Sequence, residues 1–304
     1  MASYPLFGWP TEHESCECNT FLFDERVAEG CGSPNNTALR EQLVFAIGTT
    51  SFSTVLLNLP CRESVPLAQA LILNLSAAEG LTVLEVNAWG SHWKEIWEEG
   101  TEGDGFVPSA TGVDTNGDDE GWDNVVPNLA KCTAISTLSL NNMPVTRMGW
   151  TENMAQLKSM ALKRNFITMV PTVVGRLKEL TYFSVTHGRL SRLPTELGLL
   201  TKIFHLNFQY QRLTSLPEEL GRLSLLSSIW LDGQRVLSSL PDSFGGLTNL
   251  EAIYMDANNF TALPAAIIEI AQHSQKLRRL HISDNMLLSL PVEFARLTNL
   301  WRLR

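Results

Sequence analysis

One feature of the sequence restricts the fold more than any other: a fixed set of apolar positions that returns about every 23 residues. The template LxxLxLxxNxLxxLP starts at Leu157, and its later copies start at Leu180, Ile203, Leu226, Leu250 and Leu277. Repeats of this length indicate a solenoid or a related repeat architecture. One unit cannot bury its apolar face alone, so neighbouring units must stack and share a continuous core. The sequence therefore predicts an elongated array.

The first six residues of each unit predict a short β-strand. Apolar residues at the fourth and sixth positions alternate with other residues, so they point to the same side of the strand and into the core. Proline after the last apolar position favours an extended path on the opposite side of the unit. The pattern predicts about ten strands, which begin near residues 52, 81, 135, 157, 180, 203, 226, 250, 277 and 300.

The ninth position of a unit marks where the chain leaves the strand. Asparagine is the usual residue there because its amide can hydrogen-bond the backbone groups of the turn. Asn165, Asn258 and Asn285 fit this pattern. Four other units depart from it, with Met143, Gly188, Gln211 and Gln234. We therefore expect several turns to be satisfied by different hydrogen bonds or to be locally looser.

Longer stretches of the units also recur. The segment LPTELG at 193–198 returns as LPEELG at 216–221. Over residues 135–304 these LPxx[LF]GxLTNL units resemble the 23-residue leucine-rich repeats of plant and animal Ras-group leucine-rich-repeat proteins. The resemblance implies an α/β fold: a curved solenoid with a parallel inner sheet and an irregular, 3-10 or helical convex side. It also implies a scaffold or recognition role, but not a Ras partner, since many unrelated binders share the pattern.

The repeats divide the chain into three regions. Residues 1–51 form a cysteine-containing N-terminal cap, residues 52–132 hold long, degenerate repeats with an acidic insertion at 94–127, and residues 133–304 are the regular repeats. The final unit, from Leu300, has a strand but no turn or cap. Because a solenoid needs a polar cap over its last core layer, we expect this sequence to be a fragment of a longer chain.

Charge is distributed unevenly along the chain, whose net charge is −9. Residues 94–127 carry ten acidic residues and Lys94, whereas residues 133–304 carry 18 Lys/Arg and 12 Asp/Glu. This distribution lacks a continuous basic track, which argues against nucleic-acid binding. No run approaches the roughly 18 apolar residues of a bilayer span. We therefore expect no nucleic-acid partner and no direct membrane insertion by this segment.

Four cysteines, Cys16, Cys18, Cys31 and Cys61, precede the regular repeats. They are candidates for two disulfides that tie the cap, as in secreted leucine-rich-repeat ectodomains. Two alternatives remain open: reduced, buried thiols of a cytosolic protein, or a metal site, although the Cys16–Cys18 spacing is too close for the usual CxxC zinc pair. We expect Cys132 to be a buried thiol.

Three glycosylation sequons, at Asn35, Asn74 and Asn259, favour an extracellular or cell-surface protein, although such triplets also arise by chance. A cytoplasmic location is the alternative. Reduced cysteines would favour that alternative, whereas disulfides and occupied sequons would favour the extracellular one.

The acidic insertion holds a partial calcium-loop pattern. Asp114, Asn116, Asp118 and Glu120 place oxygen-bearing side chains at alternate positions. The EF-hand loop also requires a glutamate at its twelfth position, where this sequence has Val125. We therefore expect a solvated acidic loop, with calcium binding as the alternative, and no other cofactor.

Outward strand positions carry aromatic and histidine residues over a limited part of the array. Exposed Trp and Tyr on a rigid sheet are typical of interface hot spots. The alternative is that these rings shield one another and have no partner. The predicted ligand-binding residues on the concave face are Tyr182, His187, His205, Tyr210, Trp230, Tyr254 and His281.

The motifs of the common enzyme classes do not occur. Ser184 could lie near His187 or His205, but no GxSxG nucleophile turn accompanies them. The sequence also lacks a GxxxxGK[ST] phosphate loop and an HExxH zinc motif. We expect a non-enzymatic module that binds a protein or peptide, as an ectodomain fragment of a receptor or adhesion protein. An intracellular scaffold or a structural subunit of a larger assembly is the alternative.

Overall fold

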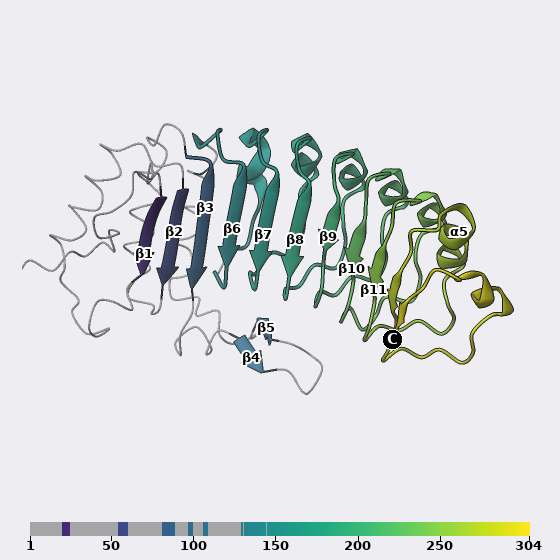
Figure 1. Cartoon of the computed structure of the whole chain (residues 1–304). Coiled ribbons are helices and arrows are strands. Elements are labelled where there is room, and N and C mark those ends of the chain that lie inside the picture. Colours follow the sequence, from purple (N-terminus) through teal and green to yellow (C-terminus); the bar gives the residue numbers. More distant parts are fainter. Residues whose placement is uncertain are drawn as a thin grey trace, which may run out of the picture.

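The strands of successive repeats lie side by side with their arrowheads in the same direction (Figure 1). This computed structural model describes residues 81–88, 129, 131–143 and 145–304, together with the backbone of four further strands. Those strands are β1 (Thr20–Asp24), β2 (Thr54–Leu59), β4 (Trp97–Glu99) and β5 (Phe106–Pro108). Within the described part of the chain, one parallel sheet contains eleven strands in sequence order, and β4 and β5 form a separate antiparallel pair.

The positions of the ten predicted strands are confirmed. After β2 come β3 (Val83–Ala88), β6 (Thr137–Asn141), β7 (Ser159–Lys163), β8 (Tyr182–Thr186), β9 (His205–Asn207), β10 (Ser228–Trp230), β11 (Ala252–Tyr254), β12 (Arg279–His281) and β13 (Arg302–Leu303). The sheet also has a strand that the sequence did not predict, since β1 lies inside the expected N-terminal cap and pairs with β2. A single apolar run without the following repeat positions gave no signal for it.

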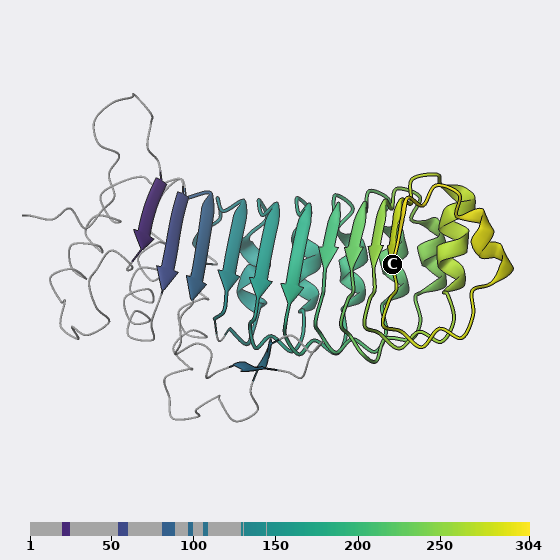
Figure 2. The same ribbon diagram turned by 60° about the horizontal axis from the view of Figure 1, so that its bottom comes forward.

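The side of the array opposite the sheet consists of short helices, which Figure 2 shows behind the strands. Proline begins most of these turns because its fixed φ suits the residue before a helix. The longest of the regular units, which starts at Leu250, has room for a true α-helix where the 23-residue units have one 3-10 turn. The helices are η4 (Gly149–Asn153), η5 (Thr172–Arg176), η6 (Thr195–Leu199), η7 (Glu218–Arg222), η8 (Asp242–Gly246), α5 (Ala265–His273) and η9 (Val292–Arg296).

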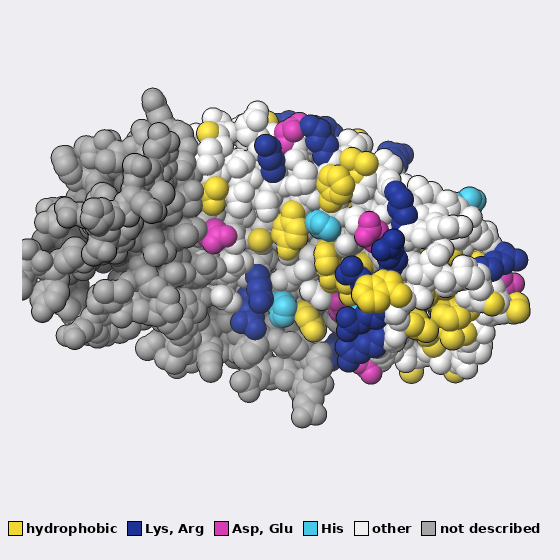
Figure 3. All heavy atoms as spheres, in the orientation of Figure 1, with side chains coloured by type: hydrophobic (Ala, Val, Ile, Leu, Met, Phe, Trp, Pro, Cys, Tyr) yellow, Lys and Arg dark blue, Asp and Glu magenta, His cyan; other side chains and the backbone are white. Residues whose placement is uncertain are grey.

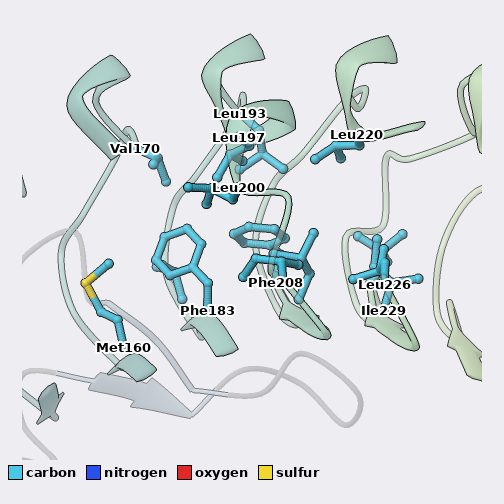
Figure 4. Packing of buried hydrophobic residues seen from close by; sticks show 14 of the residues in the cluster. Met160, Val170, Phe183, Leu193, Leu197, Leu200, Phe208, Leu220, Leu226 and Ile229 are labelled. Atoms are coloured by element: carbon cyan, nitrogen blue, oxygen red, sulfur yellow. The ribbon is translucent and has the colours of Figure 1, made fainter. Parts of the chain in front are cut away.

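The core lies between the sheet and these helices (Figure 4). Met160, Phe183 and Ile229 occupy the fourth position of their repeats and are fully buried. The ring of Phe183 packs edge-to-face against that of Phe208 in the next repeat, with centroids 5.6 Å apart. Each core layer thus contacts the layers on both sides, which is how one hydrophobic core extends along the array.

In five repeats an asparagine or glutamine side chain at position nine joins the repeat to the one before it. The amide nitrogen of Asn165 donates to the carbonyl oxygen of Leu140 (2.8 Å), and that of Gln211 donates to Val185 (2.9 Å). Both acceptors are the sixth residue of the preceding repeat. Glutamine therefore replaces asparagine without loss of the bond, because its longer side chain still reaches the same carbonyl. The same donor contact is made by Gln234, Asn258 and Asn285.

Position eight has a left-handed backbone in seven consecutive units of the described chain, with φ between 53° and 72°. This conformation costs non-glycine residues about 1 kcal/mol each. The N–H of this residue donates to the seventh residue of the next repeat, as from His187 to Gln209 (3.0 Å) and from Tyr210 to Asp232 (2.8 Å). These bonds between repeats offset the strain, so the turn keeps its shape whatever side chain it carries.

Several predictions fall on residues whose structure is not described. These are the cysteines Cys16, Cys18, Cys31 and Cys61, the sequons Asn35 and Asn74, and the calcium-loop candidates Asp114, Asn116, Asp118 and Glu120. The third sequon residue, Asn259, is half-buried. Cys132 is buried as expected, and this burial raises the pKa of its thiol, an effect that Lys131 partly opposes. In the described residues, no helix combines the length and hydropathy that a bilayer span requires.

Candidate binding surface on the sheet

Alternate residues of each strand point away from the core. In β7, Met160 and Leu162 are buried, whereas Ser159 and Ala161 are half-buried and Lys163 is exposed. Positions three, five and seven of each repeat therefore form the outer surface of the sheet, which we call the sheet face. Figure 3 shows hydrophobic and histidine side chains on the described part of this face, with Lys and Arg side chains among and around them.

Five of the seven predicted ligand-binding residues form one continuous row on the sheet face, which we call the ring row: Tyr182, His205, Trp230, Tyr254 and His281. Their ring centroids are separated in turn by 6.4, 5.7, 5.5 and 4.8 Å. The row crosses five strands, from β8 to β12. The sequence predicted these residue types on one face, and the register of the parallel strands brings their rings into contact.

The register also explains how the ring row moves from position three to position five of the repeat between β9 and β10. Tyr182 and His205 are both at position three and pair directly across β8 and β9. Trp230 and Tyr254 are at position five and pair across β10 and β11. The contact between His205 and Trp230 is therefore diagonal, because His205 pairs with Ser228. Large rings can make such diagonal contacts between neighbouring strands.

Exposure differs along the ring row. Trp230 and Tyr254 are half-buried and stack with an interplanar angle of 3°. His281, by contrast, is only 8% exposed, which the sequence did not predict. Its ring meets Tyr254 edge-to-face, and its Nδ1 lies 3.6 Å from Oδ2 of Asp256. His281 is thus placed to support Tyr254 more than to contact a partner directly.

The other two predicted residues, His187 and Tyr210, form a separate pair at the left-handed position eight. Their ring centroids are 4.4 Å apart, and the Tyr210 ring also lies over Gly233, where a Cβ would come within 2.6 Å of it. Burial lowers the pKa of His187 to about 4, helped by the positive charges of Arg164 and Lys163. His187 is therefore neutral near pH 7.

Two carboxylates lie beside the ring row at position seven, and both accept hydrogen bonds from the chain. Asp232 accepts from the backbone N–H of Asp256 (2.9 Å) and from the side-chain amide of Gln209 (2.5 Å). Asp256 accepts from the backbone N–H of Ser283 (2.6 Å). Burial raises the pKa of Asp232, while its hydrogen bonds act in the opposite direction. The carboxylate oxygens of Asp232 and Asp256 thus accept hydrogen bonds from neighbouring repeats of the array.

Arginine side chains occupy the C-terminal end of the sheet face, outside the site that the sequence predicted. Arg279 donates to the Tyr254 hydroxyl (3.4 Å), and its guanidinium lies 5.7 Å from the ring centre of Trp301. Arg302 follows it at the same position on the next strand, in register. Their shared position three was visible in the sequence, but the aromatic residues alone defined the predicted site.

A scan against protein-family models finds no match to this chain, and a search of curated proteins finds none either. Solved structures do match. A leucine-rich-repeat protein of Leptospira interrogans aligns with a TM-score of 0.59 and 20% identity, over 83% of this chain and 54% of its own. The chain has the leucine-rich-repeat fold. The chain spans about half the length of that Leptospira protein.

Two further leucine-rich-repeat structures show the same similarity. One is the leucine-rich repeat domain of the type III effector XopL, with a TM-score of 0.52 and 20% identity, over 63% of this chain and 75% of that domain. The other is the plant peptide hormone receptor RGFR1 in complex with RGF2, with a TM-score of 0.53 and 15% identity, over 83% of this chain and 38% of the receptor. At these identities the similarity establishes the fold alone.

The contacts around Ser184 do not resemble those of a hydrolytic site. Ser184 is 5% exposed, and the hydrogen bonds of the described residues include none between it and His187 or His205. A nucleophilic serine requires a base within hydrogen-bond reach and access to substrate. The described side chains also contain no group of three or more His, Cys, Asp or Glu that could hold a metal ion. What the sheet face offers is contact area and hydrogen-bonding groups.

Proposed function

We propose that this leucine-rich-repeat chain is a non-enzymatic recognition module that binds a protein or peptide segment across the ring row. The observation that carries the proposal is the continuous contact of five rings over five strands, with Trp230 and Tyr254 half exposed at its centre. Rings held by their neighbours lose little conformational freedom on binding. Tryptophan and tyrosine at the centre of a surface are the residues most often responsible for binding energy.

The form of the surface supports an extended partner. The ring row runs along the array rather than around a closed pocket, so a chain laid across the strands can reach Trp230, the central ring, without entering a pocket. Solved structures of the same fold include a plant receptor in complex with its peptide hormone. That binding belongs to the receptor, and it supports the proposal that the present chain also binds a peptide segment.

We further propose an extracellular setting, as an ectodomain fragment of a receptor or adhesion protein. The four N-terminal cysteines and the three sequons support this proposal. An intracellular scaffold or structural subunit is the alternative. Protein purified from its native source separates the two: an oxidised chain changes mobility on a gel after reduction, and occupied sequons shift after deglycosylation. Five titratable thiols without glycans would support the intracellular alternative.

Selection from a random 12-residue peptide library on immobilised protein tests the recognition role. Peptides selected on the native chain are re-measured on Trp230→Ala, which removes the central ring. Leu199→Ala is the control, because Leu199 is an exposed apolar side chain (44% exposed) on η6, behind the sheet. We expect Trp230→Ala to weaken binding by at least about tenfold and Leu199→Ala to leave it unchanged. If no selected peptide distinguishes the two variants, the ring row is not the binding surface.

A further inference from the structure

The packing of the ring row determines which part of each ring a partner can touch. Trp230 has Tyr254 stacked on one side and His205 on the other. Tyr254 likewise lies between Trp230 and His281. Because neighbouring rings occupy their faces, the accessible parts are mainly the outward rims. A ring rim carries partial positive charge, and it includes the indole N–H of Trp230 and the hydroxyl of Tyr254.

Positive side chains lie at the two ends of the ring row, on β7 and on β12 and β13. Lys163 is exposed at the C-terminal end of β7. Arg279 and Arg302 lie opposite each other on β12 and β13, an arrangement of like charges that destabilises neighbouring strands. Among the described residues, no carboxylate forms an ion pair with any of these three side chains. The face therefore has positive charge that the described part of the array leaves uncompensated.

The two carboxylates of the sheet face near the ring row do not neutralise these ends. Asp232 and Asp256 are held by the backbone N–H groups of the following repeats. They also lie at position seven of their repeats, two residues beyond the ends of β10 and β11, whereas Arg279 lies at position three of its repeat, in β12. A partner that avoids these carboxylates and meets Lys163 and Arg279 must cross the sheet face diagonally.

We propose that the partner is an extended acidic peptide segment of about eight residues, with carboxylates that meet Lys163 at one end and Arg279 at the other and with Trp230 between them. The proposal rests on the recognition role proposed above, and it adds the charge, the length and the path of the ligand. Arg302 lies next to Arg279, so the second carboxylate meets a pair of guanidinium groups, which suit carboxylates through bidentate hydrogen bonds.

The geometry of the sheet gives the length. Five strand intervals separate β7 from β12, which is about 24 Å at the usual spacing of neighbouring strands. Lys163 and Arg279 also differ by four positions within the repeat, or about 13 Å along a strand. The two Cα atoms are therefore about 27 Å apart, the length of about eight extended residues. Three fifths of the way along this line lies position five of β10, which is Trp230.

The peptides selected for Trp230 dependence provide the test. We expect them to be enriched in pairs of Asp or Glu that are about six to eight residues apart. Lys163→Glu and Arg279→Glu should each weaken their binding by about tenfold. Arg222→Glu is the matched control, because Arg222 is an exposed arginine on η7, behind the sheet, and this variant should bind normally.

Rescue separates recognition from folding defects. In a second experiment, lysine replaces one of the two acidic residues of a selected peptide. This peptide should recover binding to the charge-reversed variant whose new glutamate lies opposite the lysine, and it should not recover binding to the other variant. Lys163→Gln and Arg279→Gln serve if a reversed variant does not fold. Trp230-dependent peptides without acidic enrichment, or acidic peptides that ignore both charge reversals, would overturn the charge proposal while leaving the recognition role standing. Absence of any Trp230-dependent peptide would overturn the recognition role itself.

Discussion

Two ladders of side chains run along this array, one inside it and one outside. The inner ladder consists of the amides at position nine, and the outer ladder is the ring row. Gln234 uses both ends of its amide, donating to Phe208 (2.6 Å) and accepting from the N–H of Leu213 (3.1 Å). In the outer ladder the rings contact one another, and Trp230 remains partly exposed at the centre of the row.

The difference indicates how one periodic backbone can combine stability with the recognition role proposed above. Inside, a buried carbonyl or N–H without a partner is costly, and the amide nitrogens at position nine donate to backbone carbonyls of the preceding repeat. Outside, water can satisfy the same kinds of groups, and a ligand can replace that water. Substitutions in the inner ladder and core should therefore change folding, whereas substitutions in the outer ladder should change binding.

The core gives the largest expected effect. Phe208 is fully buried and packs against Phe183. Phe208→Ala should lower the free energy of unfolding by about 3–5 kcal/mol, because the ring leaves a cavity that the neighbouring repeats fill only in part. Denaturant titration followed by circular dichroism measures this. A loss of less than about 1 kcal/mol would mean that the layers are not coupled as their contacts indicate.

The inner ladder should give the next largest effect. Gln234→Ala leaves the carbonyl of Phe208 and the N–H of Leu213 without their present partners, and it should lower the free energy of unfolding by about 2–3 kcal/mol. Gln234→Asn is the matched variant, since asparagine makes the equivalent donor bond at Asn165. Equal stability of the two variants in denaturant titrations would contradict a role for this amide.

Trp230→Ala tests the outer ladder, where we expect a larger effect on binding than on stability. We expect peptide binding to weaken by at least about tenfold, or about 1.4 kcal/mol. The free energy of unfolding should change by only about 1 kcal/mol, through the lost ring contacts with His205 and Tyr254. Fluorescence anisotropy and denaturant titration on the same samples measure the two quantities. A variant that unfolds but binds normally in its folded fraction would reverse the assignment of the ring row.

The last expected effect is a pH dependence of stability that involves His187, which belongs to neither ladder. Its pKa is lowered to about 4 in the folded chain, whereas an unfolded histidine titrates near 6.5. Between these values the unfolded chain binds the extra proton, so the free energy of unfolding should fall as the pH decreases from about 6.5 to about 4. Comparison of the native chain with His187→Gln over this range isolates the contribution. Identical pH profiles would show that His187 does not titrate in this way.

Much of the fold could be predicted from the repeat alone. The apolar positions at four and six are buried at Met160 and Phe183, and the turn prolines stand where the helices begin. Two units have glutamine where asparagine is usual, and there Gln211 and Gln234 make the hydrogen bond that asparagine makes in other units. Strand β1 escaped prediction because it is one short apolar run with no repeat around it.

The candidate site was predicted less completely. The sequence indicated that Tyr182, Trp230 and Tyr254 share a face, because side-chain direction follows from position within the repeat. It could not give the burial of His281 or the separation of the His187–Tyr210 pair from the ring row. Those depend on the rotamers and neighbours of each side chain.

Sequence by itself thus determined the stacking direction, the repeat boundaries and the side of the sheet on which each residue lies, because these follow from a local period. Only the tertiary structure decided which residues meet across strands. His205 reaches Trp230 diagonally, and Arg279 and Arg302 lie side by side. The physical reason is register: residues 23 to 27 positions apart in sequence become neighbours only when stacked strands align.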